Sequence, residues 1–163
     1  MIKEIQNENF EYINEIYTRK FEFKKQDVEF KMRKEIAQMF FDNYLDEISK
    51  FHSIEVMDRE VKKFVNQLKE DSIILDLGCG WCWHWRDLEK YRPDIRIVAL
   101  DFVHENFFHA KKILSTETKK QIYFVNDDMH KLNFKDNTFD AIWTVQVFQH
   151  IQQISQVLRE SVR

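Results

Sequence analysis

From residue 72 onward the sequence alternates short, continuously apolar runs with segments of helical periodicity. The apolar runs cover residues 72–77, 95–101, 121–127 and 138–146, and helical segments occupy 81–91, 104–114 and 151–160. Strands that are apolar on both faces are typical of a parallel sheet covered by helices on both sides. We therefore predict an α/β fold with a Rossmann-like parallel sheet.

The first 70 residues have a different pattern, with apolar residues at helical spacing and no clear strand. One stripe starts at Phe10, Ile13 and Ile16, a second covers residues 36–48, and a third covers residues 61–68. We expect an N-terminal helical segment over residues 1–70, followed by a Rossmann-like domain over residues 71–163.

The charge balance excludes some kinds of partner. The chain has 25 Lys and Arg residues against 28 Asp and Glu, a net charge of −3, so we expect no nucleic-acid or membrane partner. The first residues are too polar for a signal peptide and no apolar run is long enough to span a bilayer. These features favour a cytoplasmic protein.

Both glycines of the chain lie in one motif, Asp76-Leu77-Gly78-Cys79-Gly80, at the end of the first apolar run. Glycines between a strand and a helix let the backbone approach a ligand closely, and the helix start favours an anionic group. A tight turn without a ligand would explain the same residues. The motif alone indicates only a Rossmann-like site.

Acidic residues also end the next two apolar runs. Asp101 follows the glycine motif by about 20 residues, where a carboxylate can accept hydrogen bonds from ribose hydroxyls. Asp128 ends the third run, where a carboxylate can accept from an amine of a base. The alternatives are a helix cap at Asp101 and a turn residue at Asp128. In register with the glycine motif, the ligand interpretation is favoured.

Cys79 and Cys82 form a C-x-x-C pair. Such a pair suits a redox motif or half of a zinc site. Structural zinc needs four ligands, no second cysteine pair exists, and His84 alone does not complete a site. We therefore expect two reduced thiols and no metal.

The three motifs in order, D-L-G-C-G, V-A-L-D and N-D-D-M-H-K-L-N-F-K-D-N-T-F-D, resemble the class I S-adenosylmethionine-dependent methyltransferases. The likeness covers about residues 55–155 and is greatest for the branch of the ubiquinone and sterol methyltransferases. It implies S-adenosyl-L-methionine as cofactor and S-adenosyl-L-homocysteine as product.

The resemblance also implies roles for particular residues. Asp76, Gly78, Cys79 and Gly80 would surround the methionine part of the cofactor. Asp101 would hold the ribose, Phe102 would lie along the adenine, and Asp128 and the backbone of Met129 would bind its edge. Thr144 and Val145 would border the sulfonium, and His150 would lie near the substrate as a candidate general base.

The sequence departs from the family pattern in two ways. Cys82 replaces the usual third glycine beside the bulky Trp81. The chain also ends after the fourth of seven strands, so we expect an incomplete domain with an open sheet edge, through which the protein could form a homo-oligomer.

We expect a methyltransferase acting on a small-molecule acceptor. One alternative is a non-catalytic module that binds the cofactor or its product. A nicotinamide-dependent oxidoreductase fits less well, because Trp83 stands where the last glycine of G-x-G-x-x-G belongs.

Overall fold

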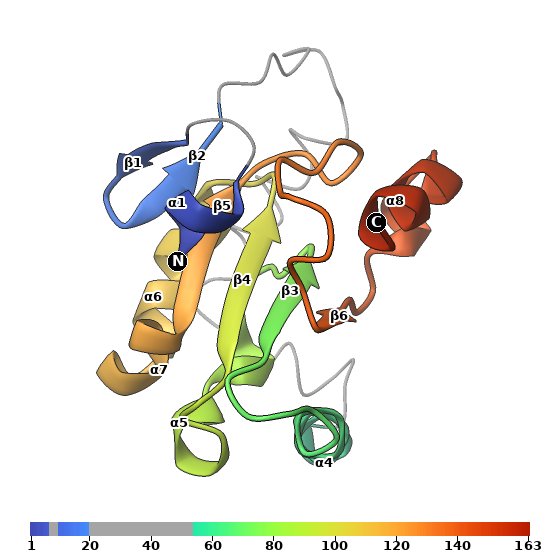
Figure 1. Ribbon diagram of the computed structural model, residues 1–163. Helices are drawn as coiled ribbons and strands as arrows, with labels where there is room; N and C mark the ends of the chain where they lie inside the picture. Colours follow the sequence, from blue (N-terminus) through green and yellow to red (C-terminus); the bar gives the residue numbers. More distant parts are fainter. Residues whose placement is uncertain (7–9, 20–53) are drawn as a thin grey trace.

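The computed structural model describes residues 1–6, 10–19 and 54–163, and within these ranges the strands form one six-stranded sheet (Figure 1). The strand order is β1-β2-β5-β4-β3-β6. The strands are β1 (Glu11–Ile13), β2 (Ile16–Thr18), β3 (Ile73–Leu77), β4 (Arg96–Asp101), β5 (Ile122–Asn126) and β6 (Ala141–Trp143).

The centre of the sheet is parallel, which confirms the predicted fold class. β4 pairs in parallel with β3 and β5, and β6 pairs in parallel with β3 on its other side. The buried side chains of β3 and β4 alternate between two separate hydrophobic clusters. Ile74 and Ile97 point into one cluster, and their neighbours Leu75 and Val98 point into the other.

Helices cover both faces of this sheet. The α-helices are α1 (Ile2–Ile5), α4 (Ile54–Val65), α5 (Leu88–Tyr91), α6 (Glu105–Ile113), α7 (Thr116–Gln121) and α8 (Ile154–Ser161). Buried residues of α4, α5 and α6 pack on the face of Ile74, whereas Ile2 of α1 and Val157 of α8 pack on the face of Leu75. None of the described helices is long and apolar enough to cross a membrane.

The N-terminal residues correct one expectation. Residues 11–18 form the antiparallel hairpin β1–β2 instead of the predicted helix, and β2 pairs in parallel with β5. Asn14 and Glu15 both have positive φ, as a tight two-residue hairpin turn requires. Ile16 points into the core from β2, which lies between β1 and β5, so its apolar character reflects sheet packing.

The other two N-terminal stripes have different outcomes. The helix predicted around residues 61–68 is confirmed as part of α4. The stripe over residues 36–48 lies outside the described residues, and the division of the chain at residue 70 stays a prediction.

The segment after the glycine motif also differs from the expected single helix over residues 81–91. It forms a 3-10 turn, η2 (Trp83–Trp85), followed by the short α5. Cys82 has a left-handed conformation with φ +55° immediately before η2. A continuous helix cannot include this conformation, so the turn begins only after Cys82.

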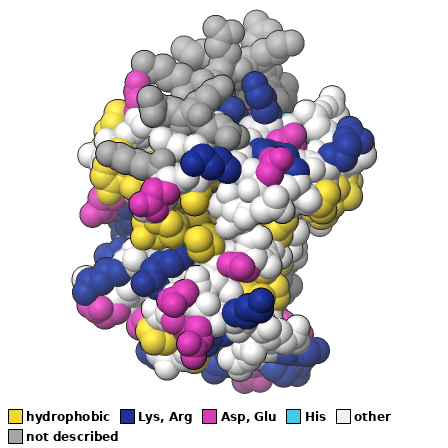
Figure 2. All heavy atoms as spheres, viewed as in Figure 1, with side chains coloured by type: hydrophobic (Ala, Val, Ile, Leu, Met, Phe, Trp, Pro, Cys, Tyr) yellow, Lys and Arg dark blue, Asp and Glu magenta, His cyan; other side chains and the backbone are white. Residues whose placement is uncertain are grey.

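At the end of the strand order opposite β1, β6 is the outermost strand among the described residues. The view in Figure 2 shows acidic and basic side chains interspersed over the described surface of this face. No region of one sign dominates there among the described residues.

Candidate cofactor site

The predicted site residues meet where β3, β4 and β5 end. The glycine loop turns back over β4, and the backbone N–H groups of Gly78 and Cys79 both donate to the carbonyl oxygen of Leu100, at 2.8 and 3.0 Å. This arrangement places the loop against Asp101 at the end of β4. The Asp127 N–H donates to the Asp101 carbonyl oxygen at 3.3 Å, so the three sequence motifs lie together at the carboxyl ends of β3, β4 and β5.

Asp101 links the glycine loop to the start of the next segment. Its Oδ2 accepts from the Gly80 N–H at 2.9 Å, and its Oδ1 accepts from the Val103 N–H at 2.8 Å. α6 begins at Glu105, beyond the turn that Asp101 closes, and its N-cap residue is His104. Asp101 therefore does not act as the N-cap of this helix and instead fixes the loop.

Asp76 points into the fold. Its side chain is 1% exposed, and Oδ2 lies 2.8 Å from the donating Trp85 Nε1 and 3.0 Å from His84 Nε2. No local sequence pattern predicts that η2 supplies these two partners. They hold the Asp76 carboxylate in the interior near the end of β3. The expected contact of this carboxylate with the cofactor stays a prediction.

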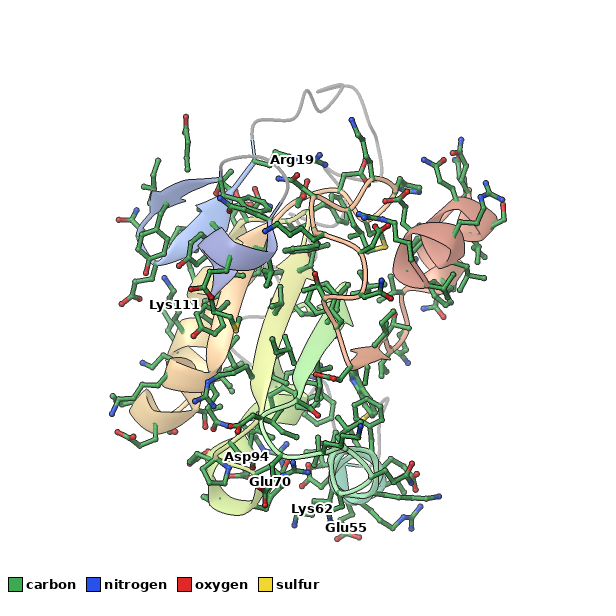
Figure 3. The ribbon with its side chains drawn as sticks, viewed as in Figure 1. Arg19, Glu55, Lys62, Glu70, Asp94 and Lys111 are labelled. Atoms are coloured by element: carbon green, nitrogen blue, oxygen red, sulfur yellow. The ribbon has the colours of Figure 1, made fainter. Side chains whose placement is uncertain are left out.

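The acidic pair after β5 divides into one buried and one half-exposed carboxylate. Asp128 accepts from the backbone N–H of His130 at 2.9 Å and lies 2.7 Å from its ring Nδ1. Asp127 is buried and forms an ion pair with Arg19, 2.6 Å away. Figure 3 labels Arg19 just beyond β2, near the ends of the central strands.

The pKa of Asp127 is raised to about 6, because burial disfavours its charged form more than Arg19 favours it. One oxygen, Oδ2, has no hydrogen-bond partner in the part of the chain that the structure describes. Sequence reasoning missed Arg19, because it precedes Asp127 by 108 residues and no local pattern connects them.

The remaining predicted residues differ in exposure. Thr144 follows β6 and donates from Oγ1 to the carbonyl oxygen of Leu77 at 3.1 Å. Phe102 and Val145 are half-buried, and Met129 is buried. His150 ends the 3-10 turn η3 (Phe148–His150), where its side chain is exposed beside Gln149.

The two glycines have different surroundings. Both have positive φ, +72° at Gly78 and +53° at Gly80. A Cβ at Gly78 would lie 2.5 Å from a methyl carbon of Val147, whereas a Cβ at Gly80 would meet no described atom within 4 Å. Among the described residues, the space beside the loop at Gly80, next to the carboxylate of Asp101, is therefore open.

The cysteines lie beneath the loop with a third potential ligand. Cys79 and Cys82 are buried, and their sulfur atoms and a carboxylate oxygen of Asp76 all lie within 4.8 Å of one another. Burial raises the pKa of both thiols, and the nearby carboxylates of Asp76 and Asp101 raise it further. Asp76 precedes Cys79 by three residues and takes the place beside the cysteines that His84 was considered for in the sequence.

Two of the tryptophans near the glycine loop are packed into the core. Trp81 and Trp85 are buried, and Trp85 packs edge-on against Trp143 with ring centroids 5.6 Å apart. A small cavity lies elsewhere, beneath α8, and includes Leu132, Phe139 and Arg163 in its lining. None of the predicted cofactor residues lines this cavity.

Comparison with known proteins agrees with the fold and the motifs. The Methyltransferase domain family matches residues 75–163. An uncharacterized methyltransferase of Schizosaccharomyces pombe is 28% identical over 131 residues, 74% of this chain and 46% of that protein. A sterol 24-C-methyltransferase of Aspergillus fumigatus is 28% identical over 97 residues, 59% of this chain and 26% of that protein.

A solved structure from Methanococcus maripaludis, described as an S-adenosyl-L-methionine-dependent methyltransferase, has the same fold. The TM-score is 0.60 at 22% identity, and the match covers 89% of this chain and 62% of that chain. The fold and the strand-end site thus define a Rossmann-like methyltransferase domain. The chain belongs to the class I S-adenosylmethionine-dependent methyltransferase family, and it spans less than half the length of the two curated relatives.

Proposed function

We propose that the chain binds S-adenosyl-L-methionine at the ends of β3, β4 and β5 and transfers its methyl group to a small-molecule acceptor. The observation that carries the proposal is the contact between Asp101 and Gly80, which joins the second acidic strand end to the glycine loop. The family match supports the same reaction.

The residues at this edge suit the cofactor. The open space at Gly80 gives a ligand access to the loop, and Asp101 lies directly beside it. A carboxylate has about four lone-pair sites, so Asp101 can accept from ribose hydroxyls in addition to its backbone donors. Asp128 is half-exposed and can accept from an amine. S-adenosylmethionine, when bound, supplies an already activated methyl group.

The chain then has to orient an acceptor and, where needed, remove its proton. Thr144 and Val145 directly follow β6. They lead to Val147, which covers Gly78 of the glycine loop. His150 is exposed nearby in the sequence and is the proposed general base for an acceptor that must lose a proton. The transfer itself requires mainly that the two reactants are held in line.

The acceptor is proposed to be small and partly apolar. The Aspergillus relative is named for a sterol, but the similarity covers only 26% of that protein. We also propose that the chain self-associates through the edge of β6. The alternative function remains a module that binds the cofactor without transferring the methyl group.

The first prediction concerns the ligand. Calorimetry of the purified chain should detect S-adenosylmethionine and S-adenosylhomocysteine but not a nicotinamide dinucleotide. Asp101→Asn should weaken binding by about tenfold or more, because it removes the charge from the hydrogen bonds to the ribose. The matched control is Asp71→Asn, at an exposed position with φ +58° that asparagine tolerates well, and it should bind normally.

Two outcomes would count against the proposal. Binding of the nicotinamide dinucleotide alone would reject the assignment of the cofactor. Normal cofactor affinity in folded Asp101→Asn would remove the proposed role of this carboxylate. A methyl-transfer assay with labelled cofactor and a panel of small acceptors separates the enzyme from the non-catalytic module, since the module binds but labels no acceptor.

A further inference from the structure

Three buried side chains with metal-binding atoms converge beneath the glycine loop. Asp76 is the penultimate residue of β3, and Cys79 and Cys82 follow it at intervals of three residues. One carboxylate oxygen and both sulfur atoms lie within 4.8 Å of one another. The loop folds this way because the Cys82 N–H donates to the Cys79 carbonyl at 3.0 Å, which closes a turn between the two cysteines.

The spacing of these atoms is close to that of a tetrahedral zinc site. Zn–S bonds of about 2.3 Å and Zn–O bonds of about 2.0–2.2 Å place tetrahedral ligand atoms about 3.5–3.8 Å apart. The separations between the three atoms therefore need to shorten by at most about 1.3 Å for them to share one ion. Rotation of the two cysteine side chains supplies movements of this size without a change in the sheet.

The surroundings also favour a cation. The Trp85 N–H donates to Asp76 Oδ2 and His84 lies against the same oxygen, so the carboxylate is held in place by groups that would form an outer shell. Asp101 adds a second negative charge near both thiols. Thiolates are soft ligands that select ions such as Zn²⁺ over Mg²⁺ or Ca²⁺.

We propose that Asp76, Cys79 and Cys82 bind one thiophilic divalent cation of the Zn²⁺ type, with water in the fourth position. Both thiols release their protons to solvent, two Zn–S bonds and one Zn–O bond form, and no atom changes its oxidation state. The ion clamps the glycine loop to the end of β3. Asp76 and Cys79 are also among the residues expected to surround the methionine part of the cofactor, so the metal is tested in the absence of cofactor.

Spectroscopy of the full chain with Co²⁺ tests the proposal. The chain contains only two cysteines, so any sulfur-to-cobalt charge-transfer band must come from this pair. The reduced, chelator-treated protein should develop this band with one equivalent of Co²⁺. One equivalent of Zn²⁺ should abolish the band and raise the melting temperature.

Cys82→Gly is the decisive variant. Glycine suits the φ of +55° at this position better than cysteine, so this variant should fold at least as well as the natural chain. It should weaken Co²⁺ binding by more than about a hundredfold, beyond the 10–100-fold effect of outer-shell changes. Asp76→Asn should also weaken binding, whereas the exposed Asp71→Asn should leave it unchanged.

The proposal is overturned if the reduced protein, with both thiols accessible to a thiol reagent after denaturation, shows no charge-transfer band. An unchanged cobalt spectrum in Cys82→Gly would overturn it equally. Failure of metal binding would leave the calorimetric test of the cofactor unaffected, because the two measurements use separate ligands.

Discussion

At the scale of single residues, the environment of Asp76 has the largest energetic consequence. A buried carboxylate is costly unless donors satisfy it, and Trp85 supplies one directly from its indole N–H. The neighbouring Trp143 provides a natural comparison. Its Nε1 is buried and has no hydrogen-bond partner within the described ranges.

The second prediction uses this pair of tryptophans. Trp85→Phe should lower the free energy of unfolding by about 1–3 kcal/mol for the lost hydrogen bond, in addition to the lost packing. Trp143→Phe removes an N–H that satisfies nothing and should cost less. Urea unfolding measures both. A double-mutant cycle with Asp76→Asn should show coupling of at least about 0.5 kcal/mol for Trp85 and almost none for Trp143. Equal coupling would contradict the assignment.

The sequence could predict that acidic residues lie at or near the carboxyl ends of the central strands, but not what their side chains contact. Asp101 is the last residue of β4, Asp76 is the penultimate residue of β3, and Asp128 lies two residues beyond β5. The partners of Asp76 come from a 3-10 turn that no helical periodicity indicates. The bonds of Asp101 to Gly80 and Val103 depend on the turn between β4 and α6, which one sequence does not define.

At the scale of elements, the glycine loop and the segment after β6 constrain each other. Val147 lies where a side chain at Gly78 would point, so these two segments fit only because Gly78 has no Cβ. Gly80 has the same left-handed backbone but faces open space. Glycine is therefore needed for packing at Gly78 and for ligand access at Gly80.

The third prediction compares alanine at these two glycines. Gly80→Ala should cost about 1–2 kcal/mol of stability from its backbone conformation and should weaken cofactor binding, because its methyl group enters the open space beside Asp101. Gly78→Ala should cost about 1–3 kcal/mol more, since the new methyl group overlaps Val147. Thermal or urea unfolding measures the difference. Val147→Ala should recover part of the loss in Gly78→Ala but none in Gly80→Ala, and recovery in both would refute this explanation.

At the scale of the whole molecule, the N-terminal hairpin extends the family-type sheet beyond β5. Its sequence looks like a helical stripe, because the turn at Asn14 gives Phe10, Ile13 and Ile16 the spacing of apolar residues in a helix. Only long-range pairing shows the actual structure. The hairpin is fixed by pairing of β2 with β5 and by the buried ion pair between Arg19 and Asp127.

The fourth prediction concerns the pH dependence of this attachment. The pKa of Asp127 is about 6 in the folded protein and near 3.9 when unfolded, so the folded state holds the proton more tightly. Its contribution to stability is complete below pH 4 and is lost as the pH rises through 6, with a slope of at most about 1.4 kcal/mol per pH unit. Chemical denaturation across this range measures the slope.

Two variants test whether Asp127 causes this change of stability with pH. Asp127→Asn should remove this component from the wild-type profile. Arg19→Gln should extend the component to higher pH, because Arg19 opposes the rise in the pKa of Asp127. Identical profiles for the wild type and Asp127→Asn would exclude the carboxylate as the cause.

The pairing of β2 with β5 also affects how the protein is made. Arg19 leaves the ribosome long before Asp127, which follows it by 108 residues. The hairpin is therefore synthesised first but has no strand to join until β5 has emerged. β3, β4 and β5 can assemble from nearer contacts, which form faster than distant ones. Until the hairpin docks, the edge of β5 is exposed to strands of other nascent chains. The hairpin is thus the first part of the sheet to be synthesised but can pair with β5 only after β5 has emerged.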